Sequence, residues 1–110
     1  MRRLVPAAFL SLCSALPAQA DGFVMGAGRW DCARALEAAN SGEGMAYEQL
    51  VGWLMGFWSH ATFTRETGFV DIVEEVGGLK IFELTMTECQ RAPGDTLLYV
   101  VSRSMIENTK

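Results

Sequence analysis

The sequence predicts an all-α fold: a small, disulfide-tied four-helix bundle, orthogonal or irregular in packing, with one short extra helix. Three observations support this class. Apolar residues recur at offsets of three, four and seven, the spacing of one face of a helix. Glycine-containing turns separate these periodic stretches. Two cysteines also remain once an N-terminal export segment is set aside.

Residues 1–20 have the pattern of a secretory signal peptide. An Arg-Arg pair at 2–3 gives a positive start, residues 4–16 form a short apolar run, and Ala-Gln-Ala at 18–20 is the small-x-small sequence that signal peptidase recognises. We expect cleavage before Asp21 and hence a periplasmic protein of Gram-negative type, without stable membrane insertion. Both the Sec and the twin-arginine export routes fit the double arginine.

Composition limits the partners that the protein can take. The chain has nine Lys and Arg and thirteen Asp and Glu, and removal of Arg2 and Arg3 leaves seven against thirteen, a formal charge of −6. About 90 residues then remain, enough for one small domain. A net negative field disfavours nucleic acid and anionic lipid, so protein clients or a protein partner are expected.

The cysteines predict one disulfide. Cys13 would leave with the signal peptide, so Cys32 and Cys89 are the pair available in an oxidising compartment. Closing a loop of nearly sixty residues stabilises a fold by roughly 4 kcal/mol in the chain-entropy model. A metal pair or a nucleophilic thiol is the alternative, but there is one histidine and no third mature cysteine to support it.

The N-terminal part of the mature chain should contain an arm, a helix and a turn. Residues 21–28 are glycine-rich and are expected to form a flexible arm before a single helical domain at 29–110. A first helix over 29–39 would turn Cys32, Leu36 and Ala39 inward. The polar turn at 40–44 contains glycines able to take positive φ, and it should fold this helix back onto the next.

The central element is a helix over Tyr47–Thr64, whose large apolar residues share one face: Tyr47, Leu50, Val51, Leu54, Phe57, Trp58 and Ala61. Gly52 and Gly56 lie on another face. Because each glycine costs about 1 kcal/mol relative to alanine in a helix, we expect another backbone to pack closely against them. The stretch could reach across a bilayer, but polar and charged residues interrupt it, which favours a core helix.

Two further elements are expected before the last helix. The central helix should end at Gly68. Residues 69–76 fit a short helix or a strand, because a short β-branched run does not decide between them, and Gly77-Gly78 should stop this element. A helix from Leu79 would follow, with an inner face made of Leu79, Phe82, Met86 and Cys89.

The last helix is expected to begin at Pro93, where the missing N–H costs nothing. Asp95 would then lie in the first turn and complement the helix dipole. The inner stripe of this helix would be Leu97, Leu98, Val101 and Met105.

Several of these features together resemble a known family. Cys32, a Trp-Leu-Met-Gly-Phe motif at 53–57, and Cys89 followed four residues later by Pro93 resemble the HdeA/HdeB-type small periplasmic proteins over residues 30–108. The resemblance implies an exported four-helix fold and an acid-stress chaperone. The residues that match the family motif and core are Trp53, Gly56, Phe57 and Pro93. The chain departs from the family at Ala92, where members commonly have a polar N-cap, and in its low lysine content.

Two functions follow as hypotheses. In the first, acid protonates the carboxylates and His60, the charge changes from −6 to about +8, and the loosened but tethered helices bind unfolded clients. In the second, the protein resembles periplasmic immunity proteins of the Rap1a/Tai type and binds one partner at neutral pH. Its candidate partner-binding anchors are Trp53, Trp58 and Phe69. A homodimer is compatible with either hypothesis.

Catalysis, metal binding and a cofactor are not expected. His60 is the only histidine, and its sequence neighbour Ser59 would point along a different helix face. The acidic pairs Glu74-Glu75 and Glu83-Glu88 are explained by solvated helix faces. The glycines of residues 21–28 match no phosphate-binding motif. The sequence therefore predicts a binding protein in preference to an enzyme.

Overall fold

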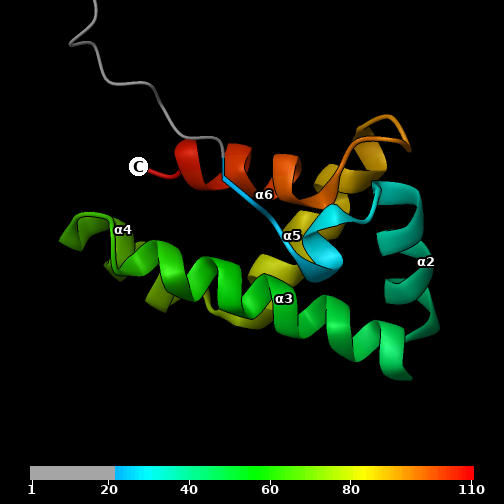
Figure 1. The fold of residues 1–110 in the computed structure, drawn as a ribbon. Helices are drawn as coiled ribbons and strands as arrows, with labels where there is room; N and C mark the ends of the chain where they lie inside the picture. The colour runs from blue at the N-terminus through cyan, green and yellow to red at the C-terminus, as the bar shows by residue number, and fades with distance from the viewer. Residues whose placement is uncertain (1–21) are drawn as a thin grey trace, which may run out of the picture.

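The structure is a computed structural model that describes residues 22–110, so the expected signal peptide and its cleavage site lie outside the described residues. Within this range the chain is helical and forms no strand (Figure 1). A 3-10 turn precedes five α-helices, with these bounds: η1 (Gly26–Arg29), α2 (Cys32–Ser41), α3 (Met45–Thr62), α4 (Thr67–Val76), α5 (Gly78–Arg91) and α6 (Leu98–Glu107). The predicted all-α, disulfide-tied bundle is confirmed.

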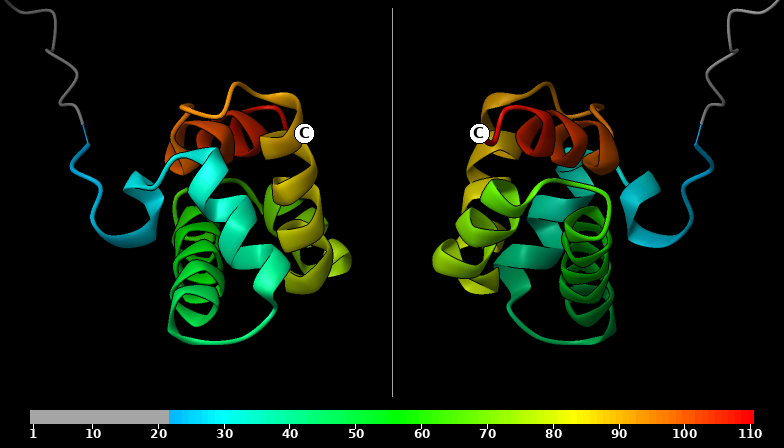
Figure 2. Two further views of the ribbon diagram at one scale, coloured as in Figure 1. Left: turned by 90° about the vertical axis from the view of Figure 1, so that its right-hand side faces the viewer. Right: turned by 90° about the vertical axis from the view of Figure 1, so that its left-hand side faces the viewer.

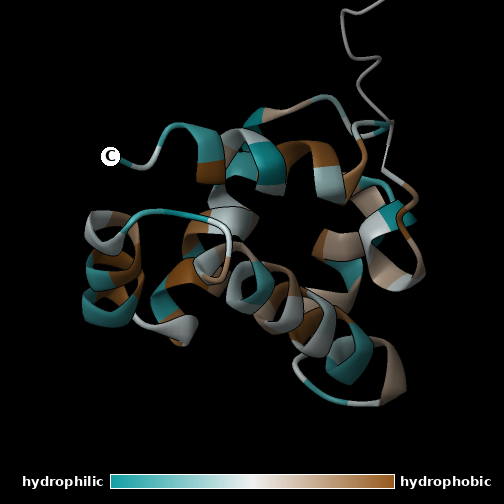
Figure 3. Ribbon diagram, turned by 60° about the vertical axis from the view of Figure 1, so that its left-hand side comes forward, coloured by the Kyte–Doolittle hydropathy of each residue, from teal (hydrophilic) through white to brown (hydrophobic). Residues whose placement is uncertain are grey.

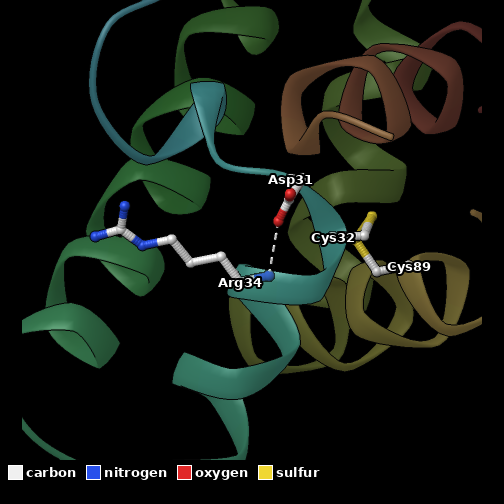
Figure 4. Close-up of a disulfide and its surroundings, with 4 residues drawn as sticks. All are labelled: Asp31, Cys32, Arg34 and Cys89. Carbon is white, nitrogen blue, oxygen red and sulfur yellow. Dashed lines mark hydrogen bonds between the residues drawn. A yellow bond between two sulfur atoms is a disulfide. The ribbon is translucent and has the colours of Figure 1, made fainter. Parts of the chain in front are cut away.

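The disulfide joins the first residue of α2 to the last turn of α5. The Cα atoms of Cys32 and Cys89 are 5.2 Å apart, an ordinary separation for a disulfide, and both side chains are buried (Figure 4). The other buried residues of α2 are Ala35 and Ala38, one turn apart, whereas the predicted inner residues Leu36 and Ala39 are half-buried. Because small side chains bury little apolar area, the covalent bond is an important addition to the packing of α2 against the core.

The segment before α6 caps α2. The backbone N–H of Cys32 donates to the Thr96 carbonyl at 2.7 Å, and the N–H of Ala33 donates to the Gly94 carbonyl at 3.0 Å. The Asp31 carboxylate accepts from the Arg34 N–H at 2.9 Å, which satisfies a further free donor of the first turn (Figure 4).

These contacts overturn the prediction that Pro93 begins the last helix. Pro93 starts a turn, closed by a hydrogen bond from the Thr96 N–H to its carbonyl, and α6 begins only at Leu98. Asp95 therefore lies outside the helix. Within α6 the buried residues are Leu98, Val101 and Ser102, so the expected stripe was right for two of its four members. The carbonyls of Gly94 and Thr96, which would lie within a helix that began at Pro93, instead accept hydrogen bonds from the first turn of α2.

The end of the expected arm is packed, not loose. Residues 22–25 have no regular structure, but Gly26–Arg29 forms the short helical turn η1 (Figure 2). Ala27 and Gly28 in this turn are buried. A methyl group added at Gly28 would overlap the indole ring of Trp53, so only glycine fits there. Trp53 stacks in turn on Phe57, with ring centroids 4.6 Å apart. Trp53, supported by Phe57, thus packs against η1.

The buried face of α3 is narrower than predicted. Leu50, Leu54, Trp58 and Ala61 are buried, whereas Tyr47, Val51 and Phe57 are half-buried. Gly52 and Gly56 are exposed, and no atom lies within 4 Å of a methyl group added at either, so the expected close approach of another backbone does not occur there. Close approaches are made instead by their neighbours: Trp53 meets Gly28, and the Met55 sulfur would lie 2.7 Å from a methyl group on Gly78.

Residues 67–76 form a helix, which settles the choice between helix and strand. The central helix ends at Thr62, so Gly68 lies in the first turn of α4 and does not end α3. Gly77, with φ of 83°, separates α4 from α5. On α5 the buried residues are Ile81, Thr85, Met86 and Cys89, and the predicted inner residue Leu79 is exposed.

The core consists of two clusters that share α3, α5 and α6. The first surrounds the disulfide and includes Leu50, Leu54 and Leu98. The second contains Trp58, Ala61, Phe69 and Ile81, with Met105 packed against both. Only the first cluster is held covalently.

Loss of the disulfide should lower stability strongly. For the C32S/C89S variant, the bond's sequence separation of 57 residues predicts a loss of about 4 kcal/mol. Each kcal/mol moves the midpoint of a domain of this size by roughly 4–8 °C. Thermal unfolding followed by circular dichroism measures the shift, and thiol titration of the denatured, unreduced protein checks the bond. Two free thiols per mature chain would contradict the pairing.

Glycine substitutions should have opposite effects at different sites. Gly28→Ala should destabilise the fold, because it displaces η1 from Trp53. Gly52→Ala and Gly56→Ala should each stabilise α3 by roughly 0.5–1 kcal/mol, since both positions are open and helical. Urea unfolding measures all three, and Gly22→Ala, with no neighbour within 4 Å, is the control. Destabilisation by the α3 substitutions would show that this face is covered.

Candidate functional site

An apolar groove lies between α4, α5 and the end of α6. It has a volume of about 250 Å³ and is open to the surface. Seven of its lining residues are apolar, and the remaining two are Glu88 and Thr109; the apolar residues are Trp58, Ile72, Val73, Val76, Ile81, Leu84 and Met105. Figure 3 shows the hydrophobic segments of α4 and α5 alternating with hydrophilic ones along these helices. Here the second core cluster reaches the surface.

Helical spacing explains why these side chains share the groove. Ile72, Val73 and Val76 are at offsets of one and four on α4, and Ile81, Leu84 and Glu88 are at offsets of three and seven on α5. Each set therefore lies along one side of its helix. Gly77 ends α4 and precedes α5, so the chain turns there and the two helices line adjacent parts of the groove.

Beneath the groove lie two of the aromatic residues singled out from the sequence. Trp58 and Phe69 stack with nearly parallel rings, 6.1 Å between centroids, and both are buried. The indole Nε1 of Trp58 is buried without a hydrogen-bond partner among the described residues, a cost that the surrounding apolar packing must offset. These residues form the inner layer of the site.

The groove has an exposed apolar edge. Leu84 is 41% exposed and Val76 38% exposed, and Leu79, at the start of α5, is 75% exposed. Single exposed apolar residues are ordinary, but two of these line a groove that leads directly into the core. The surface is therefore suited to receive an apolar side chain.

Helices α4 and α5 are rich in carboxylates, of which Glu88 lines the groove. Helix α4 carries Asp71, Glu74 and Glu75 and no basic residue. None of the three forms an ion pair with a cation within residues 22–110, whereas Glu83 and Glu88 on α5 pair with Lys80 and Arg91. Helices α4 and α5 together hold five carboxylates and two cations, a formal charge of −3.

Arg65 connects the start of α4 to the end of α6. Its guanidinium donates to the Ile106 carbonyl at 2.9 Å and to the Thr109 carbonyl at 3.2 Å. It also lies 4.1 Å from the centre of the Phe69 ring and is paired with Glu66 at 3.0 Å. One side chain thus donates to two carbonyls near the end of α6 and covers the buried ring of α4.

The pKa of Glu66 is held below its ordinary value of 4.5, mainly because its carboxylate accepts hydrogen bonds from the Arg65 side chain. A lowered pKa in the folded state means that the ionised carboxylate stabilises the fold. This contribution is present above the pKa of the unfolded state and is lost as pH falls through the lowered value. The pair is therefore sensitive to acid.

The ion pairs of the described region are local. Four occur within residues 22–110, and each joins chain neighbours or residues three or four apart. Acid therefore breaks no side-chain ion pair between distant elements. Of the four pairs, only Arg65–Glu66 includes a side chain that also contacts a distant element, because the Arg65 guanidinium donates to carbonyls near the end of α6.

Two of the three predicted aromatic anchors are buried in the folded protein. Trp58 and Phe69 lie in the core, and Trp53 is half-buried beneath η1, so none of the three candidate anchors is fully exposed in the folded state. His60 is exposed, as are Glu74 and Glu75. The sequence reasoning missed Ile72, Leu84 and Arg65. The helical spacing of the first two could have identified them, but nothing in the sequence marks Arg65.

Within residues 22–110 no three His, Cys, Asp or Glu side chains are grouped as metal ligands would be. The same region contains no helix that is both long and apolar enough to cross a membrane. No family model, curated protein or solved structure matches the chain. The site must therefore be interpreted from its own geometry.

Replacing the Arg65–Glu66 pair should change the acid response. Glu66→Gln should lower stability slightly at neutral pH, and its difference from the wild type should vanish as pH falls, because the wild-type carboxylate is then protonated as well. Arg65→Ala should cost about 1–3 kcal/mol, because it removes the hydrogen bonds from the guanidinium to the Ile106 and Thr109 carbonyls.

Urea unfolding at a series of pH values measures both effects. Arg65→Lys should recover only part of the stability, because an ammonium cannot reproduce the forked contacts. Glu107→Gln removes an ordinary surface pair with Arg103 and serves as the control. An equal pH dependence of stability in the wild type and Glu66→Gln would contradict the role assigned to Glu66.

Proposed function

We propose that this is an exported periplasmic protein that binds unfolded proteins under acid stress, as its resemblance to the HdeA/HdeB type implies. The observation that carries the proposal is the unequal attachment of the two core clusters. The cluster around Cys32 and Cys89 is closed by a covalent bond. The cluster around Trp58 and Phe69 is covered by α4, which buries one residue and is tied to α6 through Arg65.

Acid acts on this arrangement mainly through repulsion. With the signal peptide removed, protonation of thirteen carboxylates and His60 changes the formal charge from −6 to about +8. Because the ion pairs are local, little attraction between distant elements is lost, and the mutual repulsion of cations is the main destabilising force. Protonation of Glu66 adds to this by releasing the partner that orients Arg65.

The expected acid form keeps one cluster and opens the other. The disulfide holds α2 to α5, while α4 separates and uncovers Trp58, Phe69 and Ile81. These large apolar side chains would then extend the existing groove, which already reaches the surface at Leu84. An unfolded client could bury its own apolar segments there.

The protein should suppress aggregation of an acid-unfolded model substrate at pH 2–3 and have little effect at pH 7. Light scattering measures this, and the C32S/C89S variant should lose protection because its acid form is no longer tethered. A W30F/W53F variant leaves Trp58 as the single tryptophan of the three, so its fluorescence reports opening of the second cluster.

The emission of Trp58 should shift to longer wavelength over the same pH range in which protection begins. Absence of suppression at every ratio of protein to substrate would refute the chaperone function. Protection without a change at Trp58 would assign client binding to another surface.

A second candidate function is constitutive binding of one protein partner at neutral pH, as in immunity proteins of the Rap1a/Tai type. It is favoured by the groove, which is open in the folded structure and needs no acid-induced change. A single stoichiometric partner recovered from periplasmic extract at pH 7 is the result that this function requires.

A further inference from the structure

Met105 joins the two halves of the core. The cluster around the disulfide and the cluster around Trp58 and Phe69 are separate groups of buried residues. Among the described residues, Met105 is the partly buried apolar residue that packs against both groups. Its unbranched thioether is apolar and flexible, which suits a position between two packed groups. A change in the polarity of this one side chain therefore acts on the contact between the clusters.

Met105 also lines the surface of the protein. It is half-buried, and it lines both the groove of about 250 Å³ and a second hollow of about 400 Å³ between the end of α5 and α6. Hydrogen peroxide is little larger than water and can enter hollows of this size. Met86, the other methionine of the core, is 8% exposed and lines neither hollow. Of these two methionines, Met105 is therefore the one open to a small oxidant.

Oxidation changes the chemical character of the Met105 side chain. Peroxide transfers one oxygen atom to the thioether sulfur: the O–O bond breaks, the sulfur loses two electrons and forms the S–O bond of a sulfoxide, and the peroxide is reduced to water. The product is polar and needs a hydrogen-bond donor or water. On the groove side it would face mainly apolar side chains, where an unpaired polar group is costly.

The two hollows offer the new oxygen different surroundings. In the groove, the Thr109 hydroxyl already donates to the Met105 carbonyl at 2.7 Å. The Nε1 of Trp58 has no partner, but it is buried, so the oxygen would reach it only if the indole moved. The second hollow is more polar, since Ser104 and Asn108 line it. The sulfoxide is therefore expected either to turn into the second hollow or to displace Trp58, and both changes break the contact between the clusters.

Met105 lies beside the contacts that attach the start of α4 to α6. Arg65 donates to the carbonyl of Ile106, the next residue, and to that of Thr109. A displaced Met105 side chain disturbs this same last turn of α6 and the hydrogen bond that its own carbonyl accepts from Thr109. The cluster without a covalent closure thus loses its packing contact and part of its hydrogen-bonded attachment at one place.

We propose that Met105 is an oxidation site, and that its conversion to the sulfoxide loosens the cluster of Trp58 and Phe69 at neutral pH. The disulfide is already oxidised and keeps α2 tied to α5. Oxidation at pH 7 would therefore uncover the same side chains as the acid form described above. The loosening does not depend on the proposed chaperone function, whereas its consequence for clients rests on that function.

Peroxide treatment of the mature chain at pH 7 tests whether the site is reactive. Trypsin releases residues 104–110 as one peptide, because Arg103 precedes it, and Met105 is the single methionine in that peptide. Mass spectrometry therefore measures oxidation of Met105 directly. Met25 and Met45, which are 69% and 75% exposed, should be oxidised first, Met105 next and Met86 last.

The effect on the fold is measured by thermal unfolding before and after treatment. The midpoint of the wild type should fall by at least about 5 °C once Met105 is oxidised. Met105→Leu keeps an apolar side chain of similar size, and its midpoint should change by less than about 2 °C on treatment. The M25L/M45L variant removes the two exposed methionines and should respond as the wild type does.

The emission of Trp58 reports where the fold loosens. In the W30F/W53F background, treatment should shift this emission to longer wavelength, and the shift should be absent when Met105→Leu is added. Oxidation of Met105 only after unfolding in urea, an unchanged or raised midpoint once residues 104–110 carry the oxygen, or an equal loss in Met105→Leu would overturn the proposal.

An aggregation assay at pH 7 separates this inference from the chaperone function. Suppression of aggregation by the oxidised wild type, and not by oxidised Met105→Leu, would support both. A shift in Trp58 emission without any suppression would support the oxidation site and count against client binding by the second cluster.

Discussion

The fold depends first on the bond between Cys32 and Cys89. Helix α2 presents alanines to the core and so has little apolar area with which to hold itself in place. The disulfide brings its first turn against α5, beside the segment at 94–98. The free N–H groups of that turn then find the carbonyls of Gly94 and Thr96, while the N–H of Leu98 donates to the Trp30 carbonyl at 2.8 Å. The disulfide thus lies beside the hydrogen bonds that cap α2 and the hydrogen bond at Leu98, where α6 begins.

The other half of the molecule is held by weaker and more varied contacts. Helix α4 contributes Phe69 to the core, and the guanidinium of Arg65 lies over that ring while it also binds two carbonyls at the end of α6. Arg65 also forms an ion pair with Glu66, whose side chain is exposed. A covalently closed half and a non-covalently closed half therefore share α3. Under the proposed chaperone function, the non-covalently closed half is the part that opens while the rest stays folded.

The groove lies on the more weakly held half. Its apolar lining includes Trp58 and Ile81 of the second core cluster, so the surface site and the core share side chains. The two proposed functions, binding of one partner at neutral pH and binding of apolar clients in acid, would both use this surface. The physical distinction between them is whether α4 remains in place.

Local and compositional rules were enough to determine the helical class and the helical spacing of Leu50, Leu54 and Trp58, because helical period is a property of the chain itself. They also determined the pairing of Cys32 with Cys89, because the two cysteines that follow the expected signal peptide allow one pairing. Only the tertiary structure decided which faces are covered. Gly52 and Gly56 are open while Gly28 is closed by Trp53, and Pro93 begins a capping turn because distant N–H groups of α2 need acceptors. Trp58 and Phe69 are core residues and Leu84 is at the surface for the same reason: burial depends on neighbours far away in the sequence, which periodicity does not identify.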